Sequence, residues 1–130
     1  MIYWIYKKIK LMRLKKKLIK DKKFVNIEGE VECTYPEGIL LDEYVYIGPN
    51  CKMYGRGKII VSSNVIIGND VKFLTTNHNY MGTMIPYDSK GINKDIIIKE
   101  NVWIDNCTIK ECSLQGNQKY KNKKLELIHF

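Results

Sequence analysis

The residue of this chain best suited to chemistry at neutral pH is His78, in the polar stretch TTNHNY at 75–80. A neutral imidazole can accept a proton near pH 7, which makes histidine a common acid–base group. The alternative interpretation is a surface loop histidine without a role. A structural zinc site is not expected, because the only other histidine is His129 and no two cysteines have C-x-x-C spacing. The cysteines are Cys33, Cys51, Cys107 and Cys112.

A six-residue repeat leads into this histidine. The segments IGPNCK at 47–52 and IGNDVK at 67–72 each place an aliphatic residue before a glycine, two turn formers, a small apolar residue and a lysine. A fixed short period is typical of solenoids, in which each turn of chain stacks on the one before. We expect two inward-facing columns of side chains. These are Leu41, Ile47, Met53, Val61, Ile67 and Phe73 in one, and Val45, Cys51, Gly57, Val65 and Val71 in the other.

Short strands without Asn-Gly or Asp-Gly hairpin turns favour a coiled prism over hairpins. Gly48, Gly68, Asn50 and Asn69 are predicted at corners, where a positive φ is easiest for such residues. The spacing of eight between Met53 and Val61 predicts a bulge at 55–58.

The repeat is interrupted at 75–95, a long irregular loop of the kind that is often functional. It resumes with IIIKENVWID at 96–105 and then decays, because Ile104 and Ile109 are five apart and Lys110 falls at an expected core position. The predicted organisation is a helical segment at 1–23, a solenoid at 24–114 and a tail or cap at 115–130.

Residues 1–23 hold ten basic side chains and one acidic one, whereas the remainder holds 12 basic and 13 acidic groups. Nucleic-acid binding by the body is therefore not expected. The segment predicts a helix, continuous or broken, with two apolar stripes: Ile2, Ile5, Ile9 and Met12 in one, and Leu11, Leu14 and Leu18 in the other. It could contact an anionic membrane or pack on the body or a neighbouring subunit. With no stretch of transmembrane length and no apolar run typical of a signal peptide, we expect a cytoplasmic protein.

The hexapeptides, the histidine before an irregular loop and the later NVWI at 101–104 together resemble the hexapeptide-repeat acyltransferases of the maltose and galactoside O-acetyltransferase type. The resemblance covers about residues 41–109. It implies an all-β solenoid, a left-handed parallel β-helix of about four coils, with the basic helix before it and the active-site loop projecting from it. It also implies a homotrimer with sites between adjacent prisms.

What the resemblance implies chemically is transfer of acetyl from acetyl-CoA to a sugar or glycan hydroxyl, without a metal. His78 matches the catalytic histidine and would act as general base, a role worth about 10² to 10⁴ in rate. Asn77, Tyr80 and Asp88 are candidates to position the imidazole, and Trp103 to lie against cofactor or acceptor, or simply to cover the prism.

Two departures from the family pattern support an alternative. Tyr54 stands where the family carries an asparagine that helps hold the oxyanion, and NVWID replaces NVWIG, with fewer intact coils after it. These features would fit a truncated, weakly active or inactive β-helix that serves as a binding or assembly module, or a gene remnant.

Overall fold

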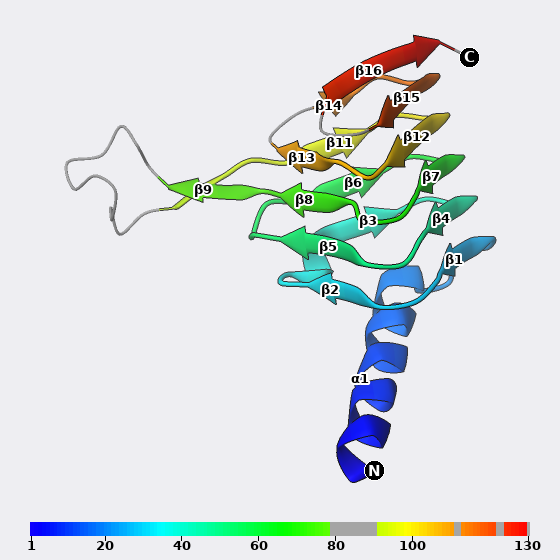
Figure 1. Cartoon of the computed structure of the whole chain (residues 1–130), viewed down its shortest axis with the longest axis vertical. Helices are drawn as coiled ribbons and strands as arrows, with labels where there is room; N and C mark the ends of the chain where they lie inside the picture. The colour runs from blue at the N-terminus through cyan, green and yellow to red at the C-terminus, as the bar shows by residue number, and fades with distance from the viewer. Residues whose placement is uncertain (79–90, 111–112, 122–123, 130) are drawn as a thin grey trace.

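The chain winds into a triangular prism of short parallel strands, with one helix projecting from its base (Figure 1). The computed structural model describes residues 1–78, 91–110, 113–121 and 124–129. The winding gives four coils, each with one strand on each of three faces. The architecture is a left-handed parallel β-helix, as predicted.

The first face contains β1, β4, β7, β12, β15 and β16, the second β2, β5, β8 and β13, and the third β3, β6, β11 and β14. The first two coils hold β1 (Val25–Ile27), β2 (Val31–Cys33), β3 (Ile39–Leu41), β4 (Val45–Ile47), β5 (Cys51–Tyr54) and β6 (Ile59–Val61), with a 3-10 turn η1 (Pro36–Gly38). The next two hold β7 (Val65–Ile67), β8 (Lys72–Leu74), β11 (Ile96–Ile98), β12 (Val102–Asp105), β13 (Thr108–Lys110) and β14 (Ser113–Leu114).

The predicted inward columns form the core. Every residue assigned to them is buried, and Ile47, Val65, Ile67, Val71 and Phe73 have no exposed surface. The strand register places equivalent side chains above one another. On the first face these are Val25, Val45, Val65 and Val102 in successive coils. Such stacking gives a continuous apolar interior although each strand has only three or four residues.

The corners differ from the prediction in one respect. Positive φ occurs at Asn50, Asp70 and Asn106 before strands of the second face, but not at Gly48, Gly68 or Asn69. Positive φ also occurs at the corner before the first face in all five layers, at Phe24, Tyr44, Asn64, Asn101 and Asn117. The two glycines are required for another reason: a Cβ on Gly48 would lie 3.0 Å from the carbonyl carbon of Gly68 in the next coil.

The segment after Ile104 is one residue shorter than the repeat requires, but the shortening falls at a corner and the repeat continues. Cys107 and Ile109 are both buried, and β13 keeps its register with β8 because Asp105 and Asn106 make a shorter turn. Lys110 consequently pairs with Leu74 and points outward. Lys110 would occupy a core position only if the six-residue register held, and the register shifts by one residue so that Ile109 faces inward instead.

Helix α1 (Ile2–Ile19) is continuous, and its two stripes have different environments. Leu18 is fully buried against the first coil, with Leu11, Leu14 and Ile19 partly buried beside it. The Lys17 ammonium contacts the Glu37 carboxylate of η1 at 3.1 Å. The stripe that begins at Ile2 faces away from the prism and remains exposed. No helix in the described part of the chain is long and apolar enough to span a bilayer.

At the other end of the prism, the first face gains two further strands. β15 (Gln118–Lys121) adds in parallel to β12, and β16 (Lys124–His129) then reverses and pairs with β15 in antiparallel fashion. Tyr120 of β15 is buried and continues the core upward. Of the residues predicted as a cap, Leu125, Leu127 and Ile128 lie in β16, and Phe130 lies outside the described residues.

Candidate functional site

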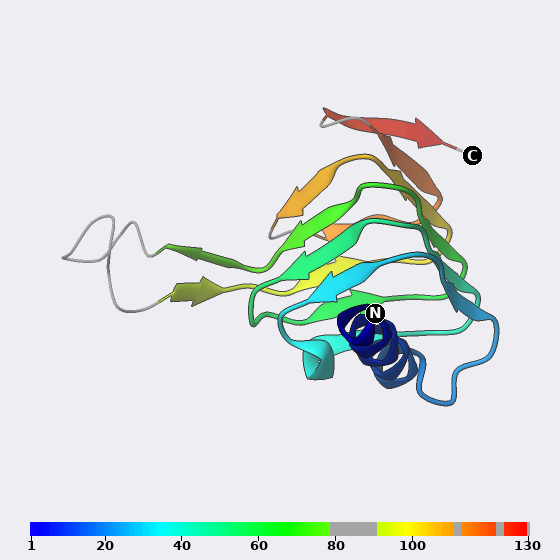
Figure 2. The ribbon, with the colours of Figure 1, turned by 60° about the horizontal axis from the view of Figure 1, so that its bottom comes forward.

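The predicted active-site loop leaves the prism as a two-stranded arm. β9 (Thr76–His78) continues outward from β8, and β10 (Gly91–Asn93) returns antiparallel to it, as Figure 2 shows. The backbone of His78 pairs with Gly91, and that of Asn77 with Ile92. The candidate base is therefore held on a projecting hairpin, beyond the third coil and outside the core.

The root of this arm is fixed by Thr75, a fully buried polar residue. Its hydroxyl donates to the Tyr54 carbonyl at 3.0 Å and accepts from the Gly57 amide at 3.1 Å. Its own amide also donates to the Tyr54 carbonyl at 2.9 Å, and its carbonyl accepts from the Lys94 amide at 2.8 Å. One threonine thus joins the second coil to both strands of the arm.

The loop at 55–58, predicted as a bulge, packs directly against this root. A Cβ on Gly57 would lie 2.6 Å from the Lys94 carbonyl oxygen and 2.8 Å from the Thr75 Cβ. Gly55 has φ +105°, a conformation that side chains rarely allow. The backbone amide of Arg56, in the coil below, donates to the side-chain hydroxyl of Thr76 in the arm at 2.9 Å.

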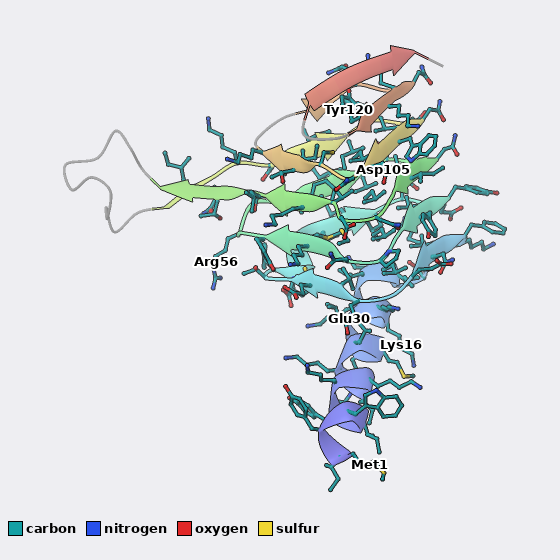
Figure 3. All side chains as sticks on the ribbon, viewed as in Figure 1. Met1, Lys16, Glu30, Arg56, Asp105 and Tyr120 are labelled. Atoms are coloured by element: carbon teal, nitrogen blue, oxygen red, sulfur yellow. The ribbon has the colours of Figure 1, made fainter. Side chains whose placement is uncertain are left out.

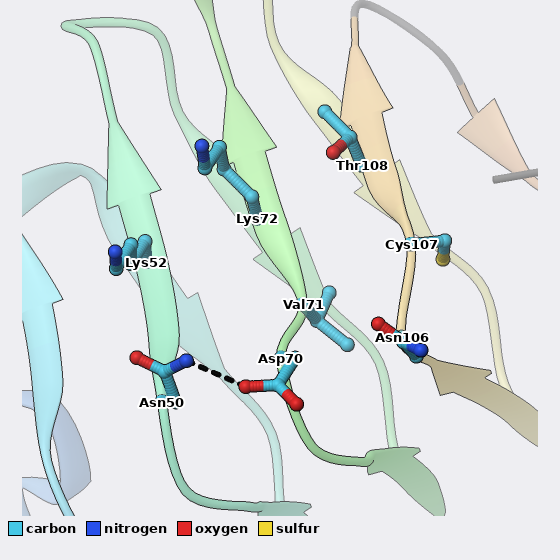
Figure 4. A pocket seen from close by; sticks show the side chains of 8 residues that line it. All are labelled: Asn50, Lys52, Asp70, Val71, Lys72, Asn106, Cys107 and Thr108. Atoms are coloured by element: carbon cyan, nitrogen blue, oxygen red, sulfur yellow. Dashed lines mark hydrogen bonds between the residues drawn. The ribbon is translucent and has the colours of Figure 1, made fainter. Parts of the chain in front are cut away.

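The second face carries a cationic spot on the coils that lead to the arm. Lys52 and Lys72 are direct neighbours in register, with Thr108 next in the same row. They line an open hollow with Asn106 and Cys107 at the adjacent corner, where the Asn50 amide donates to the Asp70 carboxylate (Figure 4). Two ammonium groups on adjacent strands repel each other, which favours an anion between them.

Tyr54 lies at the end of β5, next to the arm root. Its hydroxyl donates to the Glu32 carboxylate of the coil below, and this hydrogen bond raises the pKa of the Tyr54 hydroxyl. The side chain that replaces the expected asparagine is therefore already engaged with a carboxylate and directed toward the preceding coil.

Trp103 lies on the outward side of β12, on the first face. The Lys119 ammonium sits 3.4 Å from its ring centroid, and Ile66 is the neighbour below it. A hollow beside the ring is bounded by a ladder of asparagine side chains. In it Asn64 donates to Asn101, which donates to Asn117 at 2.8 Å. Trp103 is half-buried.

One chain does not bring all the predicted site residues together. The arm leaves the corner after the second face, whereas Trp103 belongs to β12 of the first face, and both views show the arm and β12 on opposite sides of the prism (Figures 1 and 2). For Asn77 and His78 the structure describes the backbone alone, and Tyr80 and Asp88 lie outside the described residues. In the described part of the chain no group of three His, Cys, Asp or Glu side chains could hold a metal ion.

Sequence reasoning missed the Lys52–Lys72 pair and the role of Thr75. The two lysines are 20 residues apart, which is the length of one coil between β5 and β8. Counting the residues in one coil, that is, its hexapeptides plus the corner insertions, would have predicted that Lys52 and Lys72 lie side by side. Thr75 was read only as part of the polar stretch before His78, because nothing in its neighbours marks it as buried.

Comparison with known proteins gives a match at the level of fold. No family model and no curated protein sequence matches the chain. Among solved structures, the hexapeptide-repeat containing acetyltransferase VCA0836 from Vibrio cholerae matches with a TM-score of 0.66 and 15% identity. The match covers 93% of this chain and 88% of that one. VCA0836 from Vibrio cholerae O1 biovar eltor, complexed with acetyl coenzyme A, matches with a TM-score of 0.62 and 15% identity, over 94% and 76%.

The class that the winding, core columns and corners define is the left-handed parallel β-helix built from hexapeptide repeats. Within that class, the chain shares its fold with the acetyltransferase VCA0836 over most of both lengths. This likeness confirms the fold that the resemblance implied.

Proposed function

We propose that this protein transfers an acetyl group from acetyl-CoA to a hydroxyl of a sugar or glycan, with His78 as general base. The observation that carries the proposal is the position of His78, on an arm that projects from a β-helix shared with an acetyltransferase whose solved structure holds acetyl coenzyme A. Segments that project from a rigid scaffold often carry functional side chains, and this arm, which is fixed at its root by the buried Thr75, is suited to present His78.

In the proposed step, the neutral imidazole of His78 removes the proton of the acceptor hydroxyl as its oxygen attacks the thioester carbonyl. A hydroxyl is too weak an acid to ionise at pH 7 without such a base. The tetrahedral intermediate collapses, the carbon–sulfur bond breaks, and the proton held by the imidazole passes to the leaving thiolate. The products are the acetyl ester and free CoA, so atoms and charges balance.

Lys52 and Lys72 are proposed to bind the phosphate groups of acetyl-CoA. They lie on the second face, whose third strand β8 runs directly into the arm. Phosphates bound there would leave the thioester end of the molecule free to reach toward His78. Charge-assisted contacts of this kind are the strong ones in phosphate recognition.

The proposed active form is a homotrimer in which a neighbouring prism completes the site. Within one chain, Trp103 and the arm lie on different faces, so a tryptophan that covers the substrate of His78 would have to come from another copy. Exposed Ile66 and half-buried Trp103, which are neighbours on the first face, offer apolar surface for that contact. Asn77, Tyr80 and Asp88 are proposed to orient the imidazole.

The proposed location is the cytoplasm, where acetyl-CoA is available, with residues 1–23 in peripheral contact with a membrane. The support is the concentration of basic charge in that segment.

The test is thiol release from acetyl-CoA in the presence of simple sugars, with His78→Ala against the matched control His129→Ala. The proposal predicts loss of about 10² to 10⁴ in kcat for the first and little change for the second. Thiol release that does not depend on His78 would contradict the mechanism.

A second pair of measurements examines the lysines. Lys52→Gln/Lys72→Gln should raise KM for acetyl-CoA and leave KM for S-acetylpantetheine, which has no phosphates, unchanged. Calorimetry that detects no CoA binding to the unaltered protein would favour the alternative, a catalytically inactive β-helix that acts as a binding or assembly module.

A further inference from the structure

Helix α1 has an end without a partner in the structure. The side chains of residues 1–6 are all uncharged and all exposed, and Met1 lies at the end of the helix farthest from the prism (Figure 3). Their exposed fractions are high for apolar groups, including 85% for Ile2, 69% for Tyr3 and 63% for Trp4. A monomeric soluble protein rarely leaves such a cluster in water.

The same helix separates its two apolar stripes. Leu11, Leu14 and Leu18 pack on the first coil, so that stripe is already satisfied. The stripe that runs from Ile2 through Ile5 to Ile9 and Met12 stays open, with 45% of Ile5 and 54% of Met12 exposed. An apolar surface therefore extends from the outer end of the helix along its unpartnered side.

Basic side chains form a collar directly behind residues 1–6, beside the inner part of the stripe. Lys7, Lys8, Lys10 and Arg13 follow the uncharged residues, and no acidic side chain occurs before Asp21. The Lys7 ammonium lies 4.9 Å from the Tyr3 ring centroid and that of Lys8 lies 5.1 Å from the Trp4 ring. Aromatic rings next to ammonium groups are the arrangement found where a protein meets the headgroup layer of a bilayer.

We propose that residues 1–6 insert into an anionic lipid surface and that the basic collar binds the lipid phosphates. Six helical residues span about 9 Å, which matches the depth of about 5 to 10 Å to which interfacial helices are buried. An apolar tip and a basic patch supply the two signals that stable peripheral binding requires. The body has a net charge near zero, so the attraction belongs to the helix alone.

The competing occupant is a second copy of the same helix. Bringing two such segments together would place two sets of ten basic groups side by side with a single acid in each to offset them. An anionic surface removes this repulsion, and a second copy adds to it. The charge pattern therefore favours an anionic lipid surface over a second copy of the helix as the partner of this segment.

The experiment uses the whole chain with vesicles of phosphatidylglycerol and phosphatidylcholine, and with phosphatidylcholine alone. We expect co-sedimentation with the anionic vesicles only, and its loss at 0.5 M salt because of screening. Trp103→Phe leaves Trp4 as the only tryptophan. Its emission should shift to the blue on binding and be quenched by brominated lipids.

Two matched pairs of variants locate the contact. Ile2→Gln/Ile5→Gln should abolish most binding, and Leu40→Gln/Ile66→Gln, which alters exposed residues of the prism, should not. Glutamine forms helix at least as well as isoleucine, so melting of the helix would not explain the loss. Lys7→Gln/Lys8→Gln should weaken binding about 25-fold, about fivefold per lysine, and Lys58→Gln/Lys99→Gln less than twofold.

The inference is overturned if the unaltered chain ignores anionic vesicles, or if the Ile2/Ile5 variant binds them as well as the Leu40/Ile66 control does. It is also overturned if sedimentation velocity shows self-association that depends on Ile2 and Ile5 while vesicles are not bound. None of these readouts requires acetyl transfer, so their failure would withdraw the membrane contact of residues 1–23 and leave the proposed acetyl transfer standing.

Discussion

Replacing Thr75 by valine should loosen the root of the arm while leaving the core filled. The valine methyl takes the place of the hydroxyl at almost equal volume, so the cavity contribution is small. The Tyr54 carbonyl keeps a partner, because the Thr75 amide still donates to it at 2.9 Å. The buried N–H of Gly57 donates to the Thr75 hydroxyl at 3.1 Å, and in the valine variant it is left without an acceptor. One unpaired buried N–H costs about 1 to 3 kcal/mol.

Urea unfolding followed by far-ultraviolet circular dichroism measures this loss. Denaturant slopes of about 1 to 3 kcal/mol per M are usual for small proteins, so a cost of about 2 kcal/mol moves the midpoint by about 1 M. The control is Thr108→Val, an exposed threonine in a strand of the same face. Exposed substitutions of this kind change stability by less than about 0.5 kcal/mol.

Hydrogen exchange gives a second, local readout. In the Thr75→Val protein the Gly57 amide should exchange faster than in the unaltered chain, with the first coil unaffected. The reasoning is refuted if Thr75→Val and Thr108→Val unfold at the same urea concentration and the exchange of the Gly57 amide is unchanged.

Three further outcomes are expected. Gly57→Ala should destabilise by about 1 to 3 kcal/mol, because its Cβ would meet the Lys94 carbonyl oxygen at 2.6 Å; a midpoint equal to that of the unaltered chain would contradict this. Phe73→Ala should cost about 3 to 5 kcal/mol in urea unfolding, against at most about 1.5 for the 68% exposed Phe24. Burial raises the pKa of the Cys51 thiol to about 12. Because the thiol is also only 1% exposed, its alkylation, followed by peptide mass spectrometry, should be far slower in the folded chain than in urea at every pH from 7 to 9.

The core was predictable because hexapeptide periodicity is a strong signal. Each aliphatic column required only that the inward side of a strand be apolar, and residues such as Ile47 and Phe73 meet that condition at fixed spacing. The corners were harder to predict. Glycine and asparagine both favour positive φ, and sequence could not show that the glycine at 48 serves close stacking while Asn50 takes the strained conformation.

The arrangement of the candidate site could not be predicted to the same extent. The order of residues puts NVWI after the loop, but which face carries Trp103 depends on how many residues each corner consumes. The one-residue shortening at Asp105–Asn106 shows how that count changes the register of everything after it. Contacts between successive coils, such as Lys52 with Lys72, depend on the same count.

The reversal of the chain at β16 has a consequence for solubility. The last strand on each face of a parallel prism has unpaired backbone N–H and C=O groups. Strands of another copy could pair with these groups and extend the sheets into a filament. On the first face an antiparallel strand occupies this edge, and the segment 118–124 that precedes and begins it carries four lysines. The lysines repel an incoming copy, so on this face extension of the parallel sheet by another chain is disfavoured.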